Sequence, residues 1–432
     1  MNQRTGSTAS VAIIGLGYVG LPLLLDFAKS GARVIGFDTD VAKVEQLNAG
    51  RSYIAHLRDE VAAASKTTGG FEATADFSRI SEVEAIIICV PTPLNQQHEP
   101  DLSHVRQTLD SIQPYLQKGQ IISLESTTYP GTTEEEILPR VAAAGLTVGE
   151  DIHVVYSPER LDPGPESISS RHIPKVVSGV TSSCLQKGTT LYGEVFDGVV
   201  PVSSPKVAEF SKLLENIYRA VNIGLINEMK MVAQAMNIDI WESIEAASTK
   251  PFGFTPFTPG PGLGGHCVPI DPFYLTWKAK EYGYHSHFIE LAGRINRSMP
   301  KFVVERVKEA LASREKILQE SRVLVIGVSY KSNIGDTRES PAFALMDLLS
   351  SHGAAVDYYD PHVLEIGETR DFPQWKGKQS IEWSQGLVQD YDCLLISTMH
   401  DLIDREQLEQ WAQLIVDTRN TVNSNQDHVF SA

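Results

Sequence analysis

The sequence predicts an α/β protein with two doubly wound parallel-sheet domains joined by a central helical region that contains one long helix. Three observations support this fold class. Apolar runs of strand length alternate with helix-like segments in the first and last parts of the chain. A glycine-rich turn joins the first strand to the first helix. Between the two alternating series, apolar residues recur at three- and four-residue steps, which is the helical period.

The first alternating series begins with residues 10–38, where VAIIGLGYVGLP, a helical stretch and ARVIGFD give the order strand, glycine turn, helix, strand. Similar apolar runs predict three more strands, at 85–90, 120–124 and 153–156. We therefore expect a first domain over residues 11–204. Residues 1–10 are polar and lack the apolar core of a signal peptide, so we expect a disordered leader there.

A long helix is expected from residue 205 to about residue 236. It exceeds the usual length of globular helices, so we expect it to link two domains and to carry an oligomer interface. Its apolar positions are Val207, Phe210, Leu213, Leu214, Ile217, Val221, Leu225, Met229 and Val232. A Pro/Gly-rich loop at 250–267 follows, within a predicted central helical domain of residues 205–300.

The second alternating series begins at residues 322–327 (RVLVIG) and predicts another doubly wound domain over residues 301–432. Its further strands are expected at 355–359, 393–397 and 414–417. The two α/β domains are similar in predicted architecture, without a repeated sequence.

Composition excludes several classes of function. The 37 Lys and Arg residues against 54 Asp and Glu give a formal charge of -17, which repels nucleic acid and anionic membranes. Local basic residues can still bind a small anion. The longest apolar runs are of strand length, far short of the roughly 20 residues of a membrane-spanning helix. We therefore expect neither a nucleic-acid nor a membrane partner.

The four cysteines are spread too widely for a disulfide framework, and no CxxC or HExxH spacing predicts a zinc site. This pattern fits a reducing cytoplasm and predicts no metal. Cys89 and Cys393 lie in apolar strands, where an inert thiol is expected, and Cys184 has no activating neighbour in TSSCLQ. Cys267 emerges from a glycine-rich loop beside His266, so a nucleophile and a small buried residue are both open interpretations.

The segment GLGYVG places Gly15, Gly17 and Gly20 between a strand and a helix, where missing side chains let a pyrophosphate approach the helix N-terminus. Asp38 ends the next strand, where a carboxylate can hold both ribose hydroxyls and repel a 2'-phosphate. We therefore predict dinucleotide binding, with NAD favoured over NADP; a turn that merely packs is the alternative. Lys43 could contact the adenosine side or be a solvated helix lysine.

Three residue pairs are ambiguous in sequence alone. Asp271 shares a helix face with Cys267 if the segment is helical, and is otherwise a turn or N-cap residue. Lys212 and Asn216 project from one face of the long helix, although such a pair is more often solvated. Tyr274 and Lys278 match a YxxxK pair used by other dehydrogenases, but the glycine spacing differs, so we interpret them as packing and surface residues.

The motifs GLGYVGLP, CVPTPL, LESTTYPGTTEE, YSPER, KLLENIYRAVNIGLINEM, GPGLGGHCVPIDPFYL and SYKSNIGDTRESP occur in this order. Together they closely resemble the UDP-glucose/GDP-mannose dehydrogenase family, over about Val11 to Asn420. The resemblance implies an N-terminal Rossmann domain for NAD, a central region that makes a homodimer or higher homo-oligomer, and a C-terminal Rossmann-like domain for the nucleotide sugar.

The resemblance also implies a four-electron oxidation of a sugar C6 hydroxyl. Cys267 would attack the aldehyde left by the first hydride transfer, giving a thiohemiacetal that is oxidised to a thioester and hydrolysed. Lys212 would stabilise the oxyanion. Asn216 would position the same oxygen or water, Asp271 would help proton transfer, and Thr127 and Glu159 would orient or activate water.

The binding residues implied by the resemblance fall into two sets. Those for NAD are the three glycines with Tyr18, Val19, Asp38, Lys43, Val90, Pro91, Thr92, Thr127 and Arg338. Those for the nucleotide sugar are Glu159, Arg160, Leu161, Lys212, Asn216, Phe257, Gly262, Gly264, Gly265, Lys331 and Arg419.

The substrate is the least determined feature. Family members that act on UDP-glucose usually read SPEFLxEG, whereas this chain reads SPERLDPG, with Arg160 and Pro163 as the departures. The loop before Cys267 and LESTTYPGTTEE resemble the UDP-N-acetylglucosamine 6-dehydrogenase branch. UDP-N-acetylgalactosamine, UDP-N-acetylmannosamine and UDP-glucose are alternative substrates, and a catalytically silent nucleotide-sugar binding protein is the alternative of a different class. Such sugar acids typically feed surface-polysaccharide synthesis.

Overall fold

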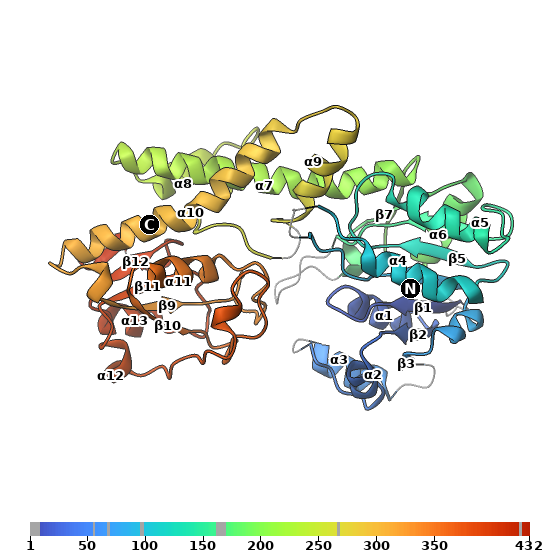
Figure 1. Ribbon diagram of the computed structural model, residues 1–432, viewed down its shortest axis with the longest axis horizontal. Helices are drawn as coiled ribbons and strands as arrows, with labels where there is room; N and C mark the ends of the chain where they lie inside the picture. Colours follow the sequence, from blue (N-terminus) through green and yellow to red (C-terminus); the bar gives the residue numbers. More distant parts are fainter. Residues whose placement is uncertain are drawn as a thin grey trace. The chain divides into compact units, whose positions relative to one another are not determined.

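The computed structural model describes residues 9–54, 57–66, 70–95, 99–160, 170–265, 268–422 and 426–432. Its fold is mixed α/β with two sheets and a helical region, which confirms the predicted fold class (Figure 1). The chain forms two compact units. The first comprises residues up to Glu215 together with Phe273–Tyr284, and the second comprises Asn216–Pro272 and His285–Ala432. The predicted divisions at residues 10, 204 and 300 stay predictions.

The first unit contains an eight-stranded sheet in the order β3-β2-β1-β4-β5-β6-β7-β8. Its strands are β1 (Ser10–Ile14), β2 (Arg33–Phe37), β3 (Phe71–Thr74), β4 (Ala85–Ile88), β5 (Ile121–Leu124), β6 (His153–Tyr156), β7 (Lys175–Gly179) and β8 (Val199–Pro201). All neighbouring pairs are parallel except β6 and β7, which are antiparallel. The first sheet is thus parallel, as predicted, apart from this one pair; an antiparallel strand near the edge of a parallel sheet is common.

Helices cover this sheet because its strands are apolar on both faces. Residues of β1 and β4 are almost fully buried along their whole length, as expected for a sheet covered on both sides. On α1, Leu21, Leu24 and Phe27 join the same apolar core. The helices of the unit are α1 (Gly20–Lys29), α2 (Val41–Asn48), α3 (Arg58–Ala64), α4 (Ser103–Ile112), α5 (Leu138–Ala143), α6 (Ser182–Gly193) and most of α9 (Asp271–Glu281).

The second unit contains a five-stranded parallel sheet in the order β10-β9-β11-β12-β13. The strands are β9 (Arg322–Ile326), β10 (Ala355–Tyr359), β11 (Cys393–Ile396), β12 (Ile415–Asp417) and β13 (Val429–Ser431). Val323 and Val325 on β9 share a core with α10 and α11. Besides part of α7, the helices are α8 (Ile240–Ser248), α10 (His287–Ala312), α11 (Pro341–Ser351), α12 (Gln385–Val388) and α13 (Arg405–Trp411).

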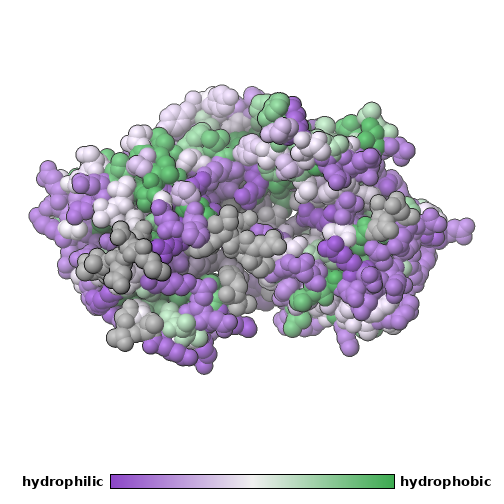
Figure 2. All heavy atoms as spheres, turned by 180° about the vertical axis from the view of Figure 1, so that it is seen from behind, coloured by the Kyte–Doolittle hydropathy of each residue, from purple (hydrophilic) through white to green (hydrophobic). Residues whose placement is uncertain are grey.

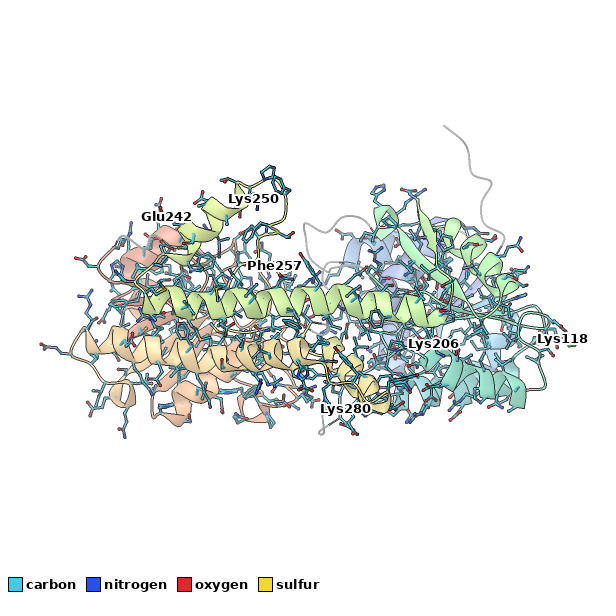
Figure 3. The ribbon with its side chains drawn as sticks, turned by 90° about the horizontal axis from the view of Figure 1, so that it is seen from above. Lys118, Lys206, Glu242, Lys250, Phe257 and Lys280 are labelled. Carbon is cyan, nitrogen blue, oxygen red and sulfur yellow. The ribbon has the colours of Figure 1, made fainter. Side chains whose placement is uncertain are left out.

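The predicted long helix is confirmed as α7 (Pro205–Ala235), 31 residues in length. Within the second unit α7 runs beside α10, as Figures 1 and 3 both show. A Cβ atom on Gly224 would lie 3.0 Å from the Cβ of Ala292, so a glycine permits the close approach of these helices. The Asn227 side-chain amide donates to Asn296 Oδ1 over 2.9 Å, and Asn296 Nδ2 donates to the Ala220 carbonyl over 3.1 Å, so buried hydrogen bonds link the two helices.

One face of α7 exposes large apolar side chains. Leu213 is buried, but the neighbouring turns expose Val207, Phe210, Leu214, Tyr218, Leu225, Met229 and Val232, and Met236 is exposed directly after the helix. Exposed apolar surface, in green, lies in patches along the upper part of the view in Figure 2. A regular apolar stripe of this length is typical of a helix that packs against another surface. Among the described residues, no helix is long and apolar enough to span a membrane.

Candidate functional site

The glycine turn after β1 has the geometry that a bound pyrophosphate needs. Gly15 has a φ of +90°, and a Cβ there would lie 2.9 Å from the carbonyl oxygen of Cys89. A Cβ on Gly20, where α1 begins, would collide with the Gly15 carbonyl. A Cβ on Gly17 would meet no atom within 4 Å, so open space adjoins the loop at that point. Val19, the N-cap of α1, gives no side-chain cap, which leaves the helix N-terminus suited to an anion.

Asp38 lies directly after β2 and supports this turn. Its Oδ2 accepts the Leu16 N–H over 3.0 Å, and its Oδ1 accepts the Asp40 N–H over 2.9 Å. Each carboxylate oxygen has a second lone pair, so the group can also accept two ribose hydroxyls. The residues present therefore fit NAD.

Lys43 lies beside this carboxylate rather than free in solvent. Its Nζ is 3.7 Å from Asp38 Oδ2 and 5.7 Å from the centre of the Tyr53 ring. Tyr53 donates its hydroxyl hydrogen to the Leu16 carbonyl. Burial, with the nearby Asp38 and Asp40 charges, raises the pKa of Tyr53, so this hydroxyl stays a donor.

The segments after β4 and β5 are tied together by side-chain hydrogen bonds. Ser126 Oγ donates to the Val90 carbonyl and Thr92 Oγ1 donates to the Thr127 carbonyl, both over 2.7 Å. Because β1 and β4 are neighbours whose onward connections run in opposite directions, the glycine turn and Val90–Thr92 flank the switch point of the sheet. Cofactors bind at such points in doubly wound sheets.

Tyr274 packs as expected, but Lys278 does not lie on the surface as predicted. The Tyr274 hydroxyl donates to the Thr92 carbonyl. The Lys278 side chain is 8% exposed and pairs with Glu135 at 2.8 Å and Glu281 at 2.9 Å. Buried lysines of this kind require such partners.

Thr127 and Glu159 occupy equivalent places on adjacent strands. Leu124 and Tyr156 are the last register partners of β5 and β6, and Thr127 and Glu159 each follow three residues later. Both therefore lie at the carboxyl edge of the first sheet. Glu159 Oε1 accepts the Arg160 N–H over 2.8 Å, and the side chain is 18% exposed.

The Arg160 guanidinium is held within the first unit. It donates to the Pro174 carbonyl over 2.8 Å and pairs with Glu215 at 2.8 Å. Leu161, Pro163, His266 and Cys267, which the sequence analysis also singled out, lie outside the described residues.

Lys212, Asn216 and Asp271 are buried, so the general expectation that such a helix pair is solvated does not apply here. Asn216 donates from Nδ2 to Asp271 Oδ2 over 2.5 Å. Asp271 is the first residue of α9, and residues 268–270 form a turn. The condition for a face shared with Cys267, a helix through 268–270, is therefore not met, and the role of Asp271 stays a prediction.

The loop before Cys267 packs closely against other residues of the second unit. A Cβ on Gly264 would lie 2.6 Å from the Cβ of Tyr330, and one on Gly265 would lie 3.0 Å from the Tyr330 ring. The Gly265 N–H donates to the Arg338 carbonyl over 3.0 Å. Gly262 has a φ of +141° and lies against Pro341. Phe257 contacts the edge of Tyr218, beside α7 in Figure 3.

Arg419 follows β12 and lies against the same loop. A Cβ on Gly260 would lie 2.4 Å from Arg419 Nη1, and Arg419 Nε donates to the Ser397 carbonyl over 3.0 Å. Burial lowers the pKa of Arg419 to about 10, although Asp417 opposes this effect. Lys331 and Arg419 lie in the loops that follow β9 and β12, and Arg419 is hydrogen-bonded to Ser397, directly after β11.

Arg338 is held by a neighbouring carboxylate. Its Nη2 donates to Asp336 Oδ2 over 2.6 Å and its Nε lies 3.0 Å from each Asp336 oxygen. Its contact with NAD stays a prediction.

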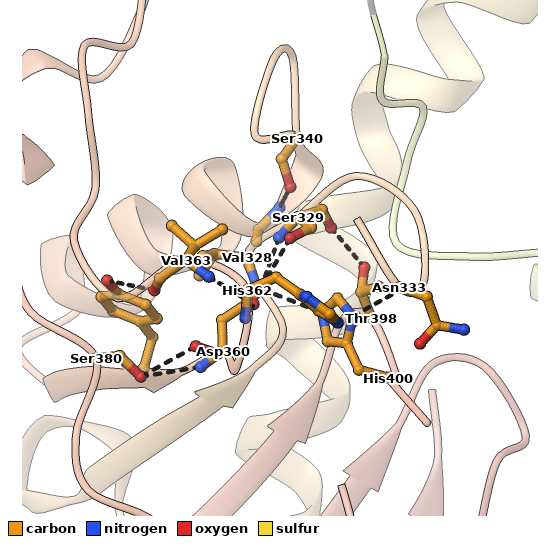
Figure 4. A network of polar contacts seen from close by, with 12 residues as sticks. Val328, Ser329, Asn333, Ser340, Asp360, His362, Val363, Ser380, Thr398 and His400 are labelled. Atoms are coloured by element: carbon orange, nitrogen blue, oxygen red, sulfur yellow. Dashed lines mark hydrogen bonds and ion pairs between the residues drawn. The ribbon is translucent and has the colours of Figure 1, made fainter. Parts of the chain in front are cut away.

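Asp360 organises the second sheet as Asp38 organises the first, and sequence reasoning missed it. It follows β10, and its Oδ2 accepts the N–H groups of Val328 and Ser329 at 2.8 and 3.1 Å (Figure 4). His400 Nε2 lies 3.2 Å from the same oxygen. Burial alone would raise the pKa of Asp360, but the His400 and backbone hydrogen bonds lower it to about 2. The detectable signal was an aspartate at the end of a strand, as at Asp38.

Three domain models of the UDP-glucose/GDP-mannose dehydrogenase family match the sequence: the NAD binding domain at residues 9–196, the central domain at 206–298 and the UDP binding domain at 324–424. The chain belongs to this family. The expectation of an NAD-dependent UDP-sugar dehydrogenase is confirmed, and the glycine turn and Asp38 lie within its NAD binding domain.

Similar proteins act on acetamido sugars. The UDP-N-acetyl-D-glucosamine 6-dehydrogenase of Pseudomonas aeruginosa is 38% identical over 82% of this chain and 83% of its own. The enzyme of the same name from Salmonella typhi is 36% identical over 90% and 89%. The solved structure of UDP-D-ManNAc dehydrogenase from Pyrococcus horikoshii superposes with a TM-score of 0.87 at 29% identity, covering 98% of both chains.

Sequence reasoning also missed Lys175. It begins β7, and its Nζ lies 2.8 Å from Glu125 Oε2 and 3.1 Å from Glu159 Oε2. The signal available in sequence was a lysine at the head of the apolar run KVVSG, where a charge needs a buried partner.

Proposed function

We propose that this dehydrogenase oxidises the C6 hydroxyl of UDP-N-acetylglucosamine to the carboxylate. One sugar nucleotide, two NAD⁺ and one water give the 6-carboxylate, two NADH and three protons. The names of the Pseudomonas and Salmonella relatives support this substrate, as do the sequences LESTTYPGTTEE and TKPFGFTPFTPGPGLGGHC. NAD, when bound, would accept one hydride in each of two oxidation steps.

The proposed chemistry is supported by the burial of Lys212 and, separately, by the hydrogen bond between the buried Asn216 and Asp271 side chains. The Lys212 ammonium would stabilise the oxygen of the alkoxide and of the tetrahedral adduct, because a fixed cation acts most strongly where water is excluded. The bond from Asn216 to Asp271 fixes the amide, so its remaining donor and acceptor can position the reacting oxygen.

Cys267 is the proposed nucleophile. Its thiolate would add to the C6 aldehyde and form a thiohemiacetal, which loses a hydride and a proton to become a thioester. Covalent attachment holds the aldehyde for the second oxidation. Water would then attack the thioester carbonyl while Glu159 takes a water proton, and the thiolate would leave and regain a proton.

NADH counting across a panel of UDP-sugars tests this proposal. We expect two NADH per UDP-N-acetylglucosamine and a 6-carboxylate product by mass spectrometry. Cys267→Ser should abolish steady turnover and retain NAD binding, whereas Cys184→Ala, the matched control at a buried thiol on α6, should keep turnover. One NADH per sugar would contradict the four-electron reaction, and no NADH with any sugar would favour the silent binding protein.

UDP-N-acetylmannosamine is a second candidate substrate, because the Pyrococcus enzyme that superposes over nearly the whole chain acts on UDP-D-ManNAc. The two sugars differ only in configuration at C2. Comparing kcat/KM for the two epimers at matched NAD concentrations distinguishes them. A tenfold preference corresponds to about 1.4 kcal/mol of transition-state binding.

We further infer a cytoplasmic homodimer. The apolar face of α7 supports a second copy as its partner, since a single helix with this pattern seldom stays solvated. The free, widely spaced cysteines Cys89, Cys184 and Cys393 are consistent with a reducing compartment.

A further inference from the structure

A buried cluster of charges lies at the carboxyl edge of the first sheet. Lys175 is 3% exposed and Glu125 is fully buried. The Lys175 ammonium donates to Glu125 Oε2 over 2.8 Å and to Glu159 Oε2 over 3.1 Å. The Tyr192 hydroxyl donates to Glu125 Oε1 over 2.7 Å and shares a 2.8 Å hydrogen bond with Ser123.

The antiparallel pairing of β6 and β7 is what places Lys175 there. Val155 pairs with Gly179 and Tyr156 with Ser178. Continuing this register by three residues brings Glu159 opposite Lys175, and the Ser157 hydroxyl bonds the Val176 carbonyl between them. A parallel β7 would put its first residue at the opposite edge of the sheet. The antiparallel direction of β7 therefore places Lys175 at the edge of the sheet where cofactor and substrate are expected.

The cluster holds the Glu159 carboxylate at both oxygens. Oε2 accepts from Lys175, and Oε1 accepts the N–H of Arg160. Glu125 alone would neutralise Lys175, so the second contact with Glu159 leaves two carboxylates around one ammonium. Such an excess of buried negative charge is unfavourable for stability, which favours a role for the contact with Glu159 beyond stability.

The groups that face Lys175 come from several elements. Glu125 and Glu159 follow β5 and β6, Tyr192 lies on α6, and Cys89 follows β4. Burial alone would lower the pKa of Lys175, but the two carboxylates raise it above its usual range. Burial raises the pKa of Tyr192 and Cys89, so both stay neutral. Burial also raises the pKa of Glu125, although Lys175 opposes this effect.

We propose that Lys175 is a positioning residue that orients the Glu159 carboxylate and keeps it ionised, so that its exposed side can take a proton from the hydrolytic water. The inference rests on the proposed function, because it assigns Glu159 to that step. In this proposal Lys175 acts through Glu159 and takes no direct part in the reaction. The proton passes from water to Glu159 and then to the Cys267 thiolate, and Lys175 keeps its own.

Substitution of Lys175 tests the proposal through the hydrolysis step. We expect Lys175→Met to lower kcat by about 100-fold, as misplacement of a reacting group does, and to accumulate the covalent thioester seen by intact mass. The acid limb of the kcat profile should move to higher pH, because a carboxylate that loses a neighbouring ammonium binds its proton more tightly. Lys175→Arg should recover part of the rate.

Controls separate positioning from folding. Lys175→Met combined with Glu125→Gln removes the surplus buried carboxylate and should still show the thioester and the shifted acid limb. Lys278→Met removes another buried, ion-paired lysine of the same unit and should leave both readouts unchanged.

A double-mutant cycle identifies the residue through which Lys175 acts. In a Glu159→Gln background, Lys175→Met should change kcat less than twofold. The inference would be overturned if the kcat loss of the double variant equalled the product of the two single losses, or if Lys175→Met left the acid limb unshifted. Either result would leave the proposed function intact. A wild-type rate in Glu159→Gln would mean that Glu159 is not the base in hydrolysis and that Lys175 does not act through it. Wild-type protein that makes no NADH would contradict the proposed function itself.

Discussion

Asp38 and Asp360 show how one residue type at one position in a fold can have different uses. Each follows the second strand of its sheet and accepts N–H groups from the turn after the first. The preceding glycines are also equivalent: Gly15 and Gly327 both have positive φ, and both donate to the neighbouring strand end. Asp38 keeps lone pairs for a ligand, whereas Asp360 is fully buried and surrounded by donors from its own unit.

Asp38 should therefore determine cofactor choice. We expect Asp38→Asn to raise the KM for NAD by about 10- to 100-fold, since hydrogen bonds to a charged group contribute about 1.5 to 3 kcal/mol. The KM for NADP should fall, because the repulsion of its 2'-phosphate is removed. Initial rates with both cofactors measure the ratio of the KM for NADP to the KM for NAD. An unchanged ratio would mean that Asp38 only supports the turn.

Asp360 should instead determine stability. Its folded pKa of about 2 lies below the ordinary aspartate value of 3.8, so its contribution is present above pH 3.8 and is lost as pH falls through 2. That difference corresponds to about 2 kcal/mol. We expect Asp360→Asn to lower the free energy of unfolding at pH 7 and to leave the KM for NAD unchanged. Urea unfolding between pH 7 and pH 2 checks this: a penalty that persists at pH 2 would contradict it.

At the level of elements, the sequence identified those with a strong local pattern. The strands β1, β2, β4, β5, β6, β9, β10, β11 and β12 and the helix α7 were all predicted, because apolar runs and helical spacing are local properties. The strands β3, β7, β8 and β13 were not: β3, β8 and β13 have only three or four residues, and in β7 (Lys175–Gly179) only Val176 and Val177 are apolar. The direction of β7 depends on pairing with β6, which no local pattern reveals.

The residues of the candidate site also fall into those that local sequence predicts and those that it does not. The glycine turn and Asp38 were predictable, since their chemistry follows from spacing along the chain. The burial of Lys212 and Asn216 was not, because helical period shows which residues share a face and not what covers it. Lys175 was missed for the same reason: its partners Glu125 and Glu159 are distant in sequence and meet only in the folded sheet.

The exposed stripe on α7 leads to a prediction about assembly. Leu225 lies within the stripe, and a charge there should prevent apolar association. We expect Leu225→Glu to shift sedimentation from dimer to monomer, with the sheets intact by circular dichroism. The control is Lys301→Glu on the exposed side of α10, which should remain dimeric. A wild-type monomer at working concentration would contradict the assembly itself.

At the scale of the whole molecule, the net charge of -17 predicts that stability falls in alkali, because deprotonating lysines increases self-repulsion. Lys230 opposes this trend. It is buried in the second unit, where its ammonium donates to the carbonyls of Thr418 and Ala432. Burial, together with the nearby charges of Arg419 and Arg306, lowers its pKa to about 7, although Asp417 opposes this effect.

The sign of the Lys230 effect follows from proton linkage. Its folded pKa lies below the ordinary value of 10.5, so between about pH 7 and 10.5 the unfolded chain binds more protons, and stability rises with pH over that window. Lys230→Met removes the buried amine. We therefore expect this variant to gain stability relative to wild type at pH 7, by up to several kcal/mol, and to lose that gain as pH approaches 10.

Lys278 supplies a control of opposite sign. Burial would lower the pKa of Lys278, but Glu135 and Glu281 raise it above the usual lysine range. Its stabilising contribution is therefore complete below about pH 10 and is lost only at higher pH. Urea unfolding of wild type, Lys230→Met and Lys278→Met at pH 7, 8.5 and 10 measures both effects. Lys278→Met should be less stable than wild type at all three values, and a Lys230→Met difference that stays constant from pH 7 to 10 would show that Lys230 keeps its charge in the folded protein.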